Sequence, residues 1–304
     1  MSLEGKLQQE AICKLAGCKK VSILITPKEK SLGGFSVRRL LPSREQRMIG
    51  PWLFFDHMGP VTFPPGEGIN VRPHPHIHLA TVTYLFAGEI LHRDSLGSLQ
   101  AIKPGDINLM IAGTGIVHSE RERPEVTRNE HTLHGLQLWL ALPEEKQDIP
   151  PEFIHYPEAT VPHVNVEGVR VRVIMGAAYG VVSPVKTLAD TLYFEAHLEA
   201  SQTLHVAAAE ERAVYVAEGE ISIDDVRIKQ FQMAVLAADS NVEIVATTSA
   251  RVAVIGGEKM APRKMFWNFA STDAARIEQA KTDWQAGRFA KVPGDETEFI
   301  PLPE

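Results

Sequence analysis

The sequence predicts an all-β protein built from two domains of the same fold. Its 304 residues exceed the usual length of a single domain. Most of the chain consists of short apolar stretches separated by Gly, Pro, Asn and Asp, which is typical of β-sandwiches and β-barrels. A segment of the first half also reappears in the second half. These three observations favour a duplicated β-barrel over a fold in which strands alternate with helices.

Several stretches are predicted strands because they are apolar and bounded by turn residues. The clearest of them are residues 80–86, 107–111, 136–140, 169–174, 192–198, 214–216 and 252–255. In residues 192–198 the apolar side chains alternate with polar ones, namely Leu192, Phe194, Ala196 and Leu198. We therefore expect one buried and one solvated face for such strands.

Two other segments have a different character. Residues 142–162 carry five prolines and several acids, so we expect them to connect the two domains. One helix is expected after an N-cap at Ser271 or Thr272, since apolar residues recur at helical spacing up to a stop at Gly287. Its apolar residues are Ile277, Ala280 and Trp284.

The internal repeat is specific. Residues 83–94 match residues 214–225 without a gap, sharing a Tyr, the run Gly-Glu-Ile and the final Asp. The Gly-Glu pair of each copy lies between apolar runs, as a tight turn between antiparallel strands requires. Extended towards the N-terminus, the match aligns His205 with His74 but places Ala207 opposite His76. We expect the chemistry in the first copy and its loss in the second.

Composition excludes several classes of protein. A net charge of −7 and a pI near 6.0 argue against a nucleic-acid surface. No stretch approaches the roughly 20 apolar residues that span a bilayer, and we expect a cytoplasmic protein without membrane contact. Only Cys13 and Cys18 are present, which excludes a disulfide framework. We expect two reduced thiols in an N-terminal arm of helical character.

Histidines are concentrated in one region, because eight of the twelve lie between His57 and His134. Side chains at alternate strand positions share a face, so His74, His76 and His78 are expected to project together. Two such imidazoles can bind one metal ion, whereas a third is carried too far along the strand.

A second pair with the same spacing lies downstream, where His118 and Glu120 stand two residues apart. If the two strands are neighbours, His74, His76, His118 and Glu120 converge on one point. Three imidazoles and a carboxylate suit iron(II), manganese, nickel, copper or zinc, and of these iron(II) is the expected ion. His78 is expected to line the pocket or to orient a ligand. Packed or solvent-facing roles are expected for the remaining histidines of this region, His57, His92, His131 and His134.

The sequence resembles the pirins, a family within the cupin superfamily. The resemblance rests on His74-Pro-His76, on Gly88, and on residues 81–85, 104–106, 112–120 and 134–139. It extends from about Gly34 to the C-terminal helix. It implies two cupin (jelly-roll) β-barrels packed face to face, with a C-terminal helix. On this basis residues 1–145 form the metal-binding barrel, and residues 146–304 form a degenerate barrel plus the helix.

The resemblance also implies the same four metal ligands: His74, His76, His118 and Glu120. Many cupins have a glutamate four residues after the paired histidines, where this sequence has Ala80, so Glu120 is expected to be the single carboxylate ligand. His78 is a further departure from commoner pirin sequences.

The activity implied by the resemblance is that of a flavonol 2,3-dioxygenase, which cleaves quercetin-like substrates with dioxygen. Glu120 is expected to accept the proton of the enolic substrate. An apolar mouth formed by Phe54, Phe55, Met58 and Met110 is expected to contact the aromatic ring. The alternative is an iron-binding redox sensor that regulates a protein partner.

Overall fold

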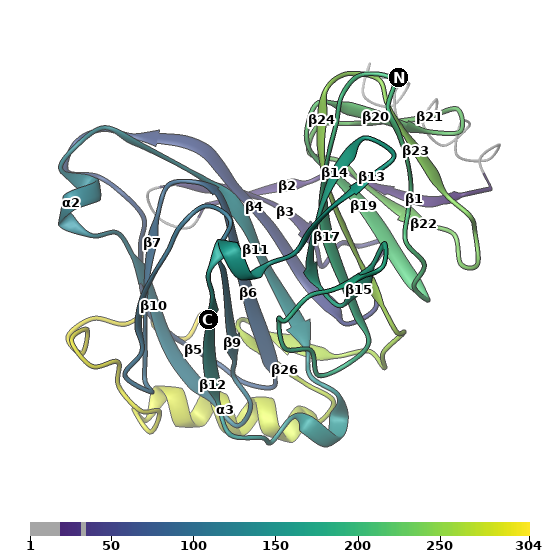
Figure 1. The fold of residues 1–304 in the computed structure, drawn as a ribbon. Coiled ribbons are helices and arrows are strands. Elements are labelled where there is room, and N and C mark those ends of the chain that lie inside the picture. The colour runs from purple at the N-terminus through teal and green to yellow at the C-terminus, as the bar shows by residue number, and fades with distance from the viewer. Residues whose placement is uncertain (1–18, 32–34) are drawn as a thin grey trace, which may run out of the picture. The chain divides into compact units, whose positions relative to one another are not determined.

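The computed structural model describes residues 19–31 and 35–304 (Figure 1). Its contacts divide the chain into two compact units, each assembled from segments that are distant in sequence. We call the unit of Glu29–Arg39, Trp52–Thr160 and Met260–Glu304 the first barrel. The unit formed by the described residues up to Lys28, by Leu40–Pro51 and by Val161–Lys259 is the second barrel. Cys13 and Cys18 lie outside the described residues.

The first barrel combines a seven-stranded and a four-stranded antiparallel sheet. The larger sheet has the order β12-β9-β6-β11-β4-β3-β2, with the bounds β2 (Lys28–Ser31), β3 (Ser36–Leu41), β4 (Trp52–Phe63), β6 (Leu79–Ala87), β9 (Ile107–Ile111), β11 (His131–Ala141) and β12 (Glu152–Tyr156). The smaller sheet has the order β5-β10-β7-β8, with the bounds β5 (Asn70–His76), β7 (Ile90–Asp94), β8 (Leu99–Ile102) and β10 (Ile116–Arg121).

Short elements complete this unit. They are α2 (Pro124–Thr127), the 3-10 turns η1 (Glu144–Lys146) and η2 (Glu158–Thr160), the hairpin β25 (Lys264–Phe266) and β26 (Phe269–Ser271), and α3 (Ala274–Gln285). No helix among the residues that the structure describes is both long and apolar enough to cross a membrane.

The second barrel repeats the arrangement of a large and a small sheet. The large sheet, in the order β1-β22-β19-β24-β17-β14-β13, consists of β1 (Val21–Ile25), β13 (His163–Val166), β14 (Val169–Met175), β17 (Thr191–Leu198), β19 (Glu211–Glu218), β22 (Met233–Leu236) and β24 (Ala250–Gly257). The small sheet, in the order β18-β23-β20-β21, consists of β18 (Thr203–His205), β20 (Glu220–Ile223), β21 (Val226–Lys229) and β23 (Glu243–Ala246). A separate hairpin joins β15 (Ala177–Ala178) to β16 (Val181–Val182).

The sequence repeat corresponds to equivalent elements of the two barrels. Its first copy covers the end of β6 and all of β7, and its second copy covers β19 and β20. Gly88 and Gly219 occupy the turns between these strands with φ angles of 88° and 76°, a region that glycine adopts without strain. The all-β fold and the predicted tight turns are therefore confirmed.

The proline-rich segment 142–162 is more than a connection. It contains β12, which pairs antiparallel with β9 and forms the edge of the large sheet in the first barrel. Pro151 and Pro157 stand immediately before and after this strand, where no ladder hydrogen bond is lost. Prolines thus delimit a strand here, and the segment expected to connect the two domains also contributes a strand to the first barrel.

The N-terminal arm also differs from expectation where it is described. Val21–Ile25 form the strand β1, not a helix, and pair with β22 at the edge of the second barrel. Val21 and Ile25 are buried, because the edge of the sheet offers them an apolar surface.

The N-cap of the C-terminal helix lies one residue after Thr272 and two after Ser271, the two expected caps. Asp273 is the N-cap, and its side chain accepts a hydrogen bond from the backbone N–H of Ala275 at 2.9 Å. The helix buries Ile277 and Ala280 against Ile77 and Phe269, all within the first barrel. Figure 1 shows α3 beside β26. The expected boundary at 145/146 differs from this division, in which α3 belongs with the first barrel.

Candidate metal centre

Two neighbouring strands bring three of the predicted ligands together. β10 pairs antiparallel with β5, which places His118 opposite His74 and Ile116 opposite His76. The ring nitrogens that His74, His76 and His118 offer all lie within 4.8 Å of one another, and the three side chains are buried. The Nε2 atoms of His76 and His118 are 3.1 Å apart. One metal ion between them would contact all three imidazoles.

The electrostatic environment keeps these imidazoles neutral. Burial lowers the pKa of His74 to about 4 and lowers the pKa values of His76 and His118 well below the ordinary value. The Nδ1–H of His74 donates to the backbone carbonyl of Arg72 at 2.9 Å, which leaves its Nε2 with a free lone pair. Neutral imidazoles with available lone pairs are the form that binds a transition metal, so the donor set fits such an ion.

Glu120, the fourth predicted ligand, stands apart from this group. Within the described part of the chain, the cluster of potential ligand atoms contains the three histidines and not Glu120. The register shifts at this point: His118 pairs with His74, but Glu120 pairs with Val71, so β5 has an extra residue opposite this step. Burial raises the pKa of Glu120 to about 7. Its carboxyl group therefore has a proton affinity suited to acid–base chemistry near neutral pH.

A neighbour of the cluster was not singled out from the sequence. His92 on β7 is buried, and its Nδ1 lies 3.4 Å from the Nδ1 of His118. Its Nε2 donates to the carboxylate of Asp94 at 2.9 Å. The available sequence signal was a His-x-Asp pair on a predicted strand of the repeat, with the same spacing as the two ligand pairs. A packed or solvent-facing role was expected for His92, because a single histidine on a strand usually has one.

The four apolar pocket candidates have different surroundings. Phe54 stacks on Trp139 with ring centroids 3.8 Å apart, and Trp139 meets His76 edge-on at 5.1 Å. Phe54 therefore belongs to an aromatic wall beside the histidines. Phe55 follows it on β4 and points to the opposite face of the sheet, away from this wall.

The two methionines lie on the same face as Phe54. Met110 lies opposite Thr81, which in turn lies opposite Trp139, so Met110 shares the face that carries the aromatic wall. Met58 lies four residues after Phe54 on β4, in unbroken register with β11, and is buried in an apolar cluster with Phe63. The structure thus places Phe54, Met58 and Met110, but not Phe55, on the face of the histidines.

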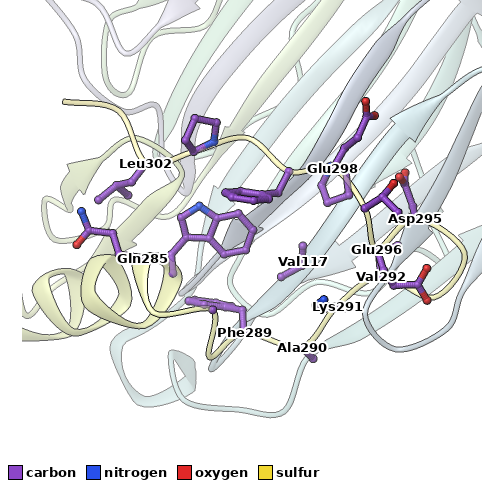
Figure 2. A pocket seen from close by; sticks show the side chains of 16 residues that line it. Val117, Gln285, Phe289, Ala290, Lys291, Val292, Asp295, Glu296, Glu298 and Leu302 are labelled. Atoms are coloured by element: carbon purple, nitrogen blue, oxygen red, sulfur yellow. The ribbon is translucent and has the colours of Figure 1, made fainter.

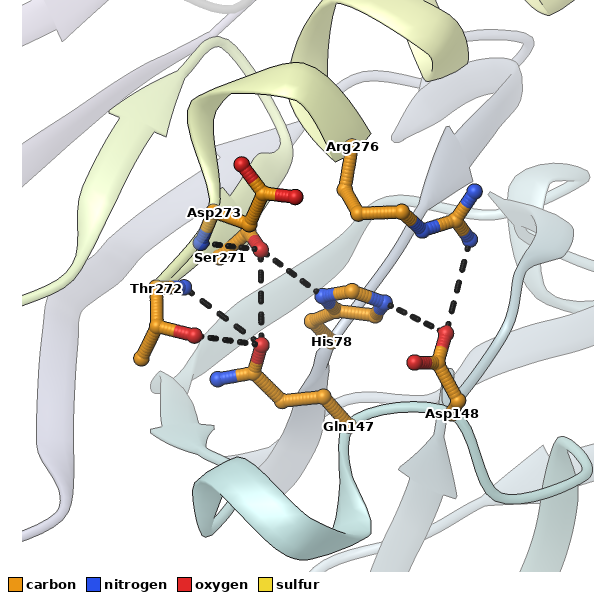
Figure 3. A network of polar contacts seen from close by, with 7 residues as sticks. All are labelled: His78, Gln147, Asp148, Ser271, Thr272, Asp273 and Arg276. Carbon is orange, nitrogen blue, oxygen red and sulfur yellow. Dashed lines mark hydrogen bonds and ion pairs between the residues drawn. The ribbon is translucent and has the colours of Figure 1, made fainter.

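His78 does not continue the strand of the ligands, contrary to expectation (Figure 3). β5 ends at His76, and His78 has a φ angle of 58°, which turns its side chain away from the alternating pattern. Its Nδ1 lies 3.1 Å from the hydroxyl of Ser271, and its Nε2 lies 3.2 Å from a carboxylate oxygen of Asp148. The buried ring thereby connects the end of the ligand strand to the start of α3.

A separate cavity of about 580 Å³ lies between α3 and the C-terminal segment (Figure 2). Its apolar wall includes Trp284 and Phe289, and it reaches Pro73 and Val117. These two residues are sequence neighbours of His74 and His118, and on a strand neighbouring side chains point to opposite faces. The cavity therefore lies behind the ligand strands and is distinct from the metal centre.

Comparisons with known proteins agree with this architecture. The family model of pirin matches residues 34–140, and that of the pirin C-terminal cupin domain matches residues 193–290. A pirin-like protein of Caulobacter vibrioides is 44% identical over 288 residues, which cover 93% of this chain and 100% of that protein. Human pirin is 31% identical over 238 residues, covering 76% of this chain and 79% of its own.

Among solved structures, a quercetin 2,3-dioxygenase from Acinetobacter baumannii superimposes with a TM-score of 0.86. It is 34% identical in sequence, and the match covers 93% of this chain and 95% of that one. Both family models, the full-length relative and the shared bicupin structure lead to one conclusion. This chain belongs to the pirin family.

Proposed function

We propose that this protein is a metal-dependent dioxygenase that acts on a quercetin-like flavonol or another enolic aromatic molecule. The observation that carries the proposal is the convergence of three buried, neutral imidazoles from His74, His76 and His118. Three nitrogen ligands leave coordination positions open, which a catalytic site needs and a closed structural site does not. The likeness to a quercetin 2,3-dioxygenase supports the choice of substrate class.

A transition-metal ion bound there, with iron(II) as our expectation, would supply the Lewis acidity and redox capacity that dioxygen chemistry requires. The chain supplies the remaining functions. The three histidines would hold the ion, and the carboxylate of Glu120, which is not part of their cluster, would accept the proton of the substrate hydroxyl. A pKa near 7 allows Glu120 to take up a proton and to release it at neutral pH.

The aromatic wall supports a planar, apolar substrate. Phe54 and Trp139 are stacked, and Trp139 contacts His76 directly. A flavonol ring lying against this wall would be oriented towards the histidines and would exclude water from them. Replacing Phe54 by Leu should therefore raise KM more than it lowers kcat.

The test is oxygen uptake by the iron-loaded protein with quercetin, measured together with the loss of flavonol absorbance. We expect uptake that requires the substrate and disappears in the His76→Ala variant. A Glu120→Gln variant should remain folded and metal-loaded but turn over slowly, because its side chain accepts no proton. Absence of uptake above the His76→Ala control, across several flavonols, would refute the proposed activity and favour the regulatory role.

A further inference from the structure

Three buried side chains form a hydrogen-bonded chain that reaches the metal centre from β7. Asp94, His92 and His118 are all less than one-tenth exposed. The Oδ2 of Asp94 lies 2.9 Å from the Nε2 of His92, and the Nδ1 of His92 lies 3.4 Å from the Nδ1 of His118. The Nε2 at the far side of the His118 ring faces the Nε2 of His76.

We propose that Asp94 and His92 are positioning residues that hold His118 in the tautomer whose Nε2 lone pair faces the metal. The inference rests on the part of the proposed function in which the three histidines bind a metal ion, and it is independent of the substrate. It assigns a role to His92, for which the sequence predicted only packing.

The directions of the hydrogen bonds follow from what each atom can do. An ionised carboxylate only accepts, so the proton between Asp94 and His92 belongs to the Nε2 of His92. A His92 ring whose single proton is on Nε2 has its lone pair on Nδ1, which can accept the Nδ1–H of His118 at 3.4 Å. His118 is left with a lone pair on Nε2, the atom that belongs to the ligand cluster. Each member thus fixes the tautomer of the next.

The first member of the chain is itself held by the backbone. The Oδ1 of Asp94 accepts hydrogen bonds from the N–H groups of Leu96 and Ser98 at 2.9 and 3.1 Å, which leaves Oδ2 for His92. The ring of His92 is stacked on Phe153 at a centroid distance of 4.2 Å and an interplanar angle of 9°. Both contacts restrict rotation, so the orientation of the chain is built in before any metal binds.

This anchoring makes the effect of Asp94→Asn specific. The two backbone N–H groups retain the amide oxygen, and the amide nitrogen is therefore turned towards His92. As a donor it requires a lone pair on the Nε2 of His92, which moves the ring proton to Nδ1. That proton then faces the Nδ1 of His118, which must accept it. The ring proton of His118 therefore moves to its Nε2, where it blocks the metal position. The exchange of one oxygen for one NH₂ should thus reverse the whole chain.

The experiment combines two readouts that need no substrate. In the metal-free protein labelled with ¹⁵N-histidine, NMR shifts report which nitrogen of His118 carries the proton, with His118→Gln used for assignment. Zinc affinity is then measured by competition with a chelator. For Asp94→Asn we expect the His118 proton on Nε2 and zinc binding weaker by about 10–100-fold, the usual effect of losing a partner of a ligand. Asp225→Asn, the counterpart in the second repeat, should change neither quantity.

Variants at His92 separate positioning from packing. His92→Asn keeps an acceptor near the former Nδ1, so it should preserve the tautomer of His118 and most of the zinc affinity. His92→Phe keeps a ring to stack on Phe153 but has no acceptor, and it should lose both. Equal losses in the two variants, or an unchanged tautomer and affinity in a folded Asp94→Asn protein, would overturn the inference. A protein that passes these tests but consumes no oxygen with flavonols would refute the activity alone.

Discussion

The small sheets of the two barrels have the same strand order, but the side chains that they bury differ in kind. In the first barrel, β5, β10 and β7 direct histidines into the interior. In the second barrel, the corresponding strands β18, β23 and β20 contribute apolar residues to a continuous hydrophobic core, among them Leu204, Ile221, Ile223, Ile244 and Ala246. The architecture therefore does not require a metal, and the ligands are an addition to a fold that packs well without them.

His205 shows how one position along a strand separates the two cases. The repeat aligns it with His74, yet its side chain is 59% exposed and pairs with Glu243 at 3.3 Å. Leu204 and Val206 on either side of it are buried, so His205 faces outward. Because strand side chains alternate, a shift by one residue exchanges the inner and the outer face. The second barrel thus differs from the first in the orientation of this histidine as well as in residue type, since Ala207 stands opposite His76 in the repeat.

The interior of the first barrel is also less favourable for folding. Burying a polar group without a full set of partners costs about 1–3 kcal/mol, whereas burying a Leu or Ile side chain stabilises by about 1.5–3 kcal/mol. The first barrel buries four imidazoles here, those of His74, His76, His92 and His118, where the second barrel buries apolar side chains. We infer that the first barrel is less stable because its interior is built for binding, whereas the second barrel keeps the stability of an apolar core.

Removal of a ligand should have the largest effect. His74→Ala is expected to weaken metal binding by at least about 1,000-fold, since losing only an outer partner of a ligand costs 10–100-fold. His205→Ala, its counterpart in the repeat, should leave metal content unchanged and alter the free energy of unfolding by no more than about 0.5 kcal/mol. Metal content by elemental analysis and affinity by chelator competition measure both. Equal effects of the two variants would remove the distinction between the barrels.

Placing a histidine in the second barrel should come next. Ile223 aligns with His92 in the repeat and is fully buried. We expect Ile223→His to lower the free energy of unfolding by about 3 kcal/mol, because apolar burial is lost and the imidazole finds no polar chain around it. Hydrogen exchange of peptides from β19 and β20 locates the effect. The conservative Ile223→Val should cost about 1 kcal/mol. If Ile223→His lowered the free energy of unfolding no more than Ile223→Val, the two interiors would not differ as described.

The smallest effect concerns the anchor of α3 in the first barrel. Ser271→Ala removes a hydroxyl that lies beside the Nδ1 of His78. The same hydroxyl accepts a hydrogen bond from the backbone N–H of Asp273 at 3.0 Å. Leaving buried polar atoms unpartnered should cost about 1–2 kcal/mol of unfolding free energy. Asp148→Ala should cost less than about 1 kcal/mol, since the Asp148 side chain is 69% exposed. Chemical denaturation measures the free energy of unfolding of both variants. A larger decrease for Asp148→Ala than for Ser271→Ala would show that Ser271 is not the main contact between His78 and the start of α3.

Much of the molecule was predictable from local patterns. The bounds of β9 agree residue for residue with the predicted strand 107–111, and the turns at Gly88 and Gly219 follow from the repeat. His74, His76 and His118 were selected because a period of two residues puts side chains on one face. Such patterns act over a few residues, and for that reason a sequence displays them directly.

What failed depends on which strands become neighbours. β12 is a strand because the edge of β9 accepts it, and α3 belongs to the first barrel because Phe269 and Ile77 offer it an apolar surface. Glu120 is not part of the histidine cluster, and the pairing of β5 with β10 shifts its register beside it.

By itself, the sequence determined an all-β duplication with three histidines set to converge in its first copy. Only the tertiary structure decided that His78 turns away from them and that Asp94 and His92 stand behind His118. The physical reason is that alternation along a strand is a property of its own backbone. The partner of each ring nitrogen, in contrast, comes from another strand or from α3, and its position is set by the register and packing of the whole barrel.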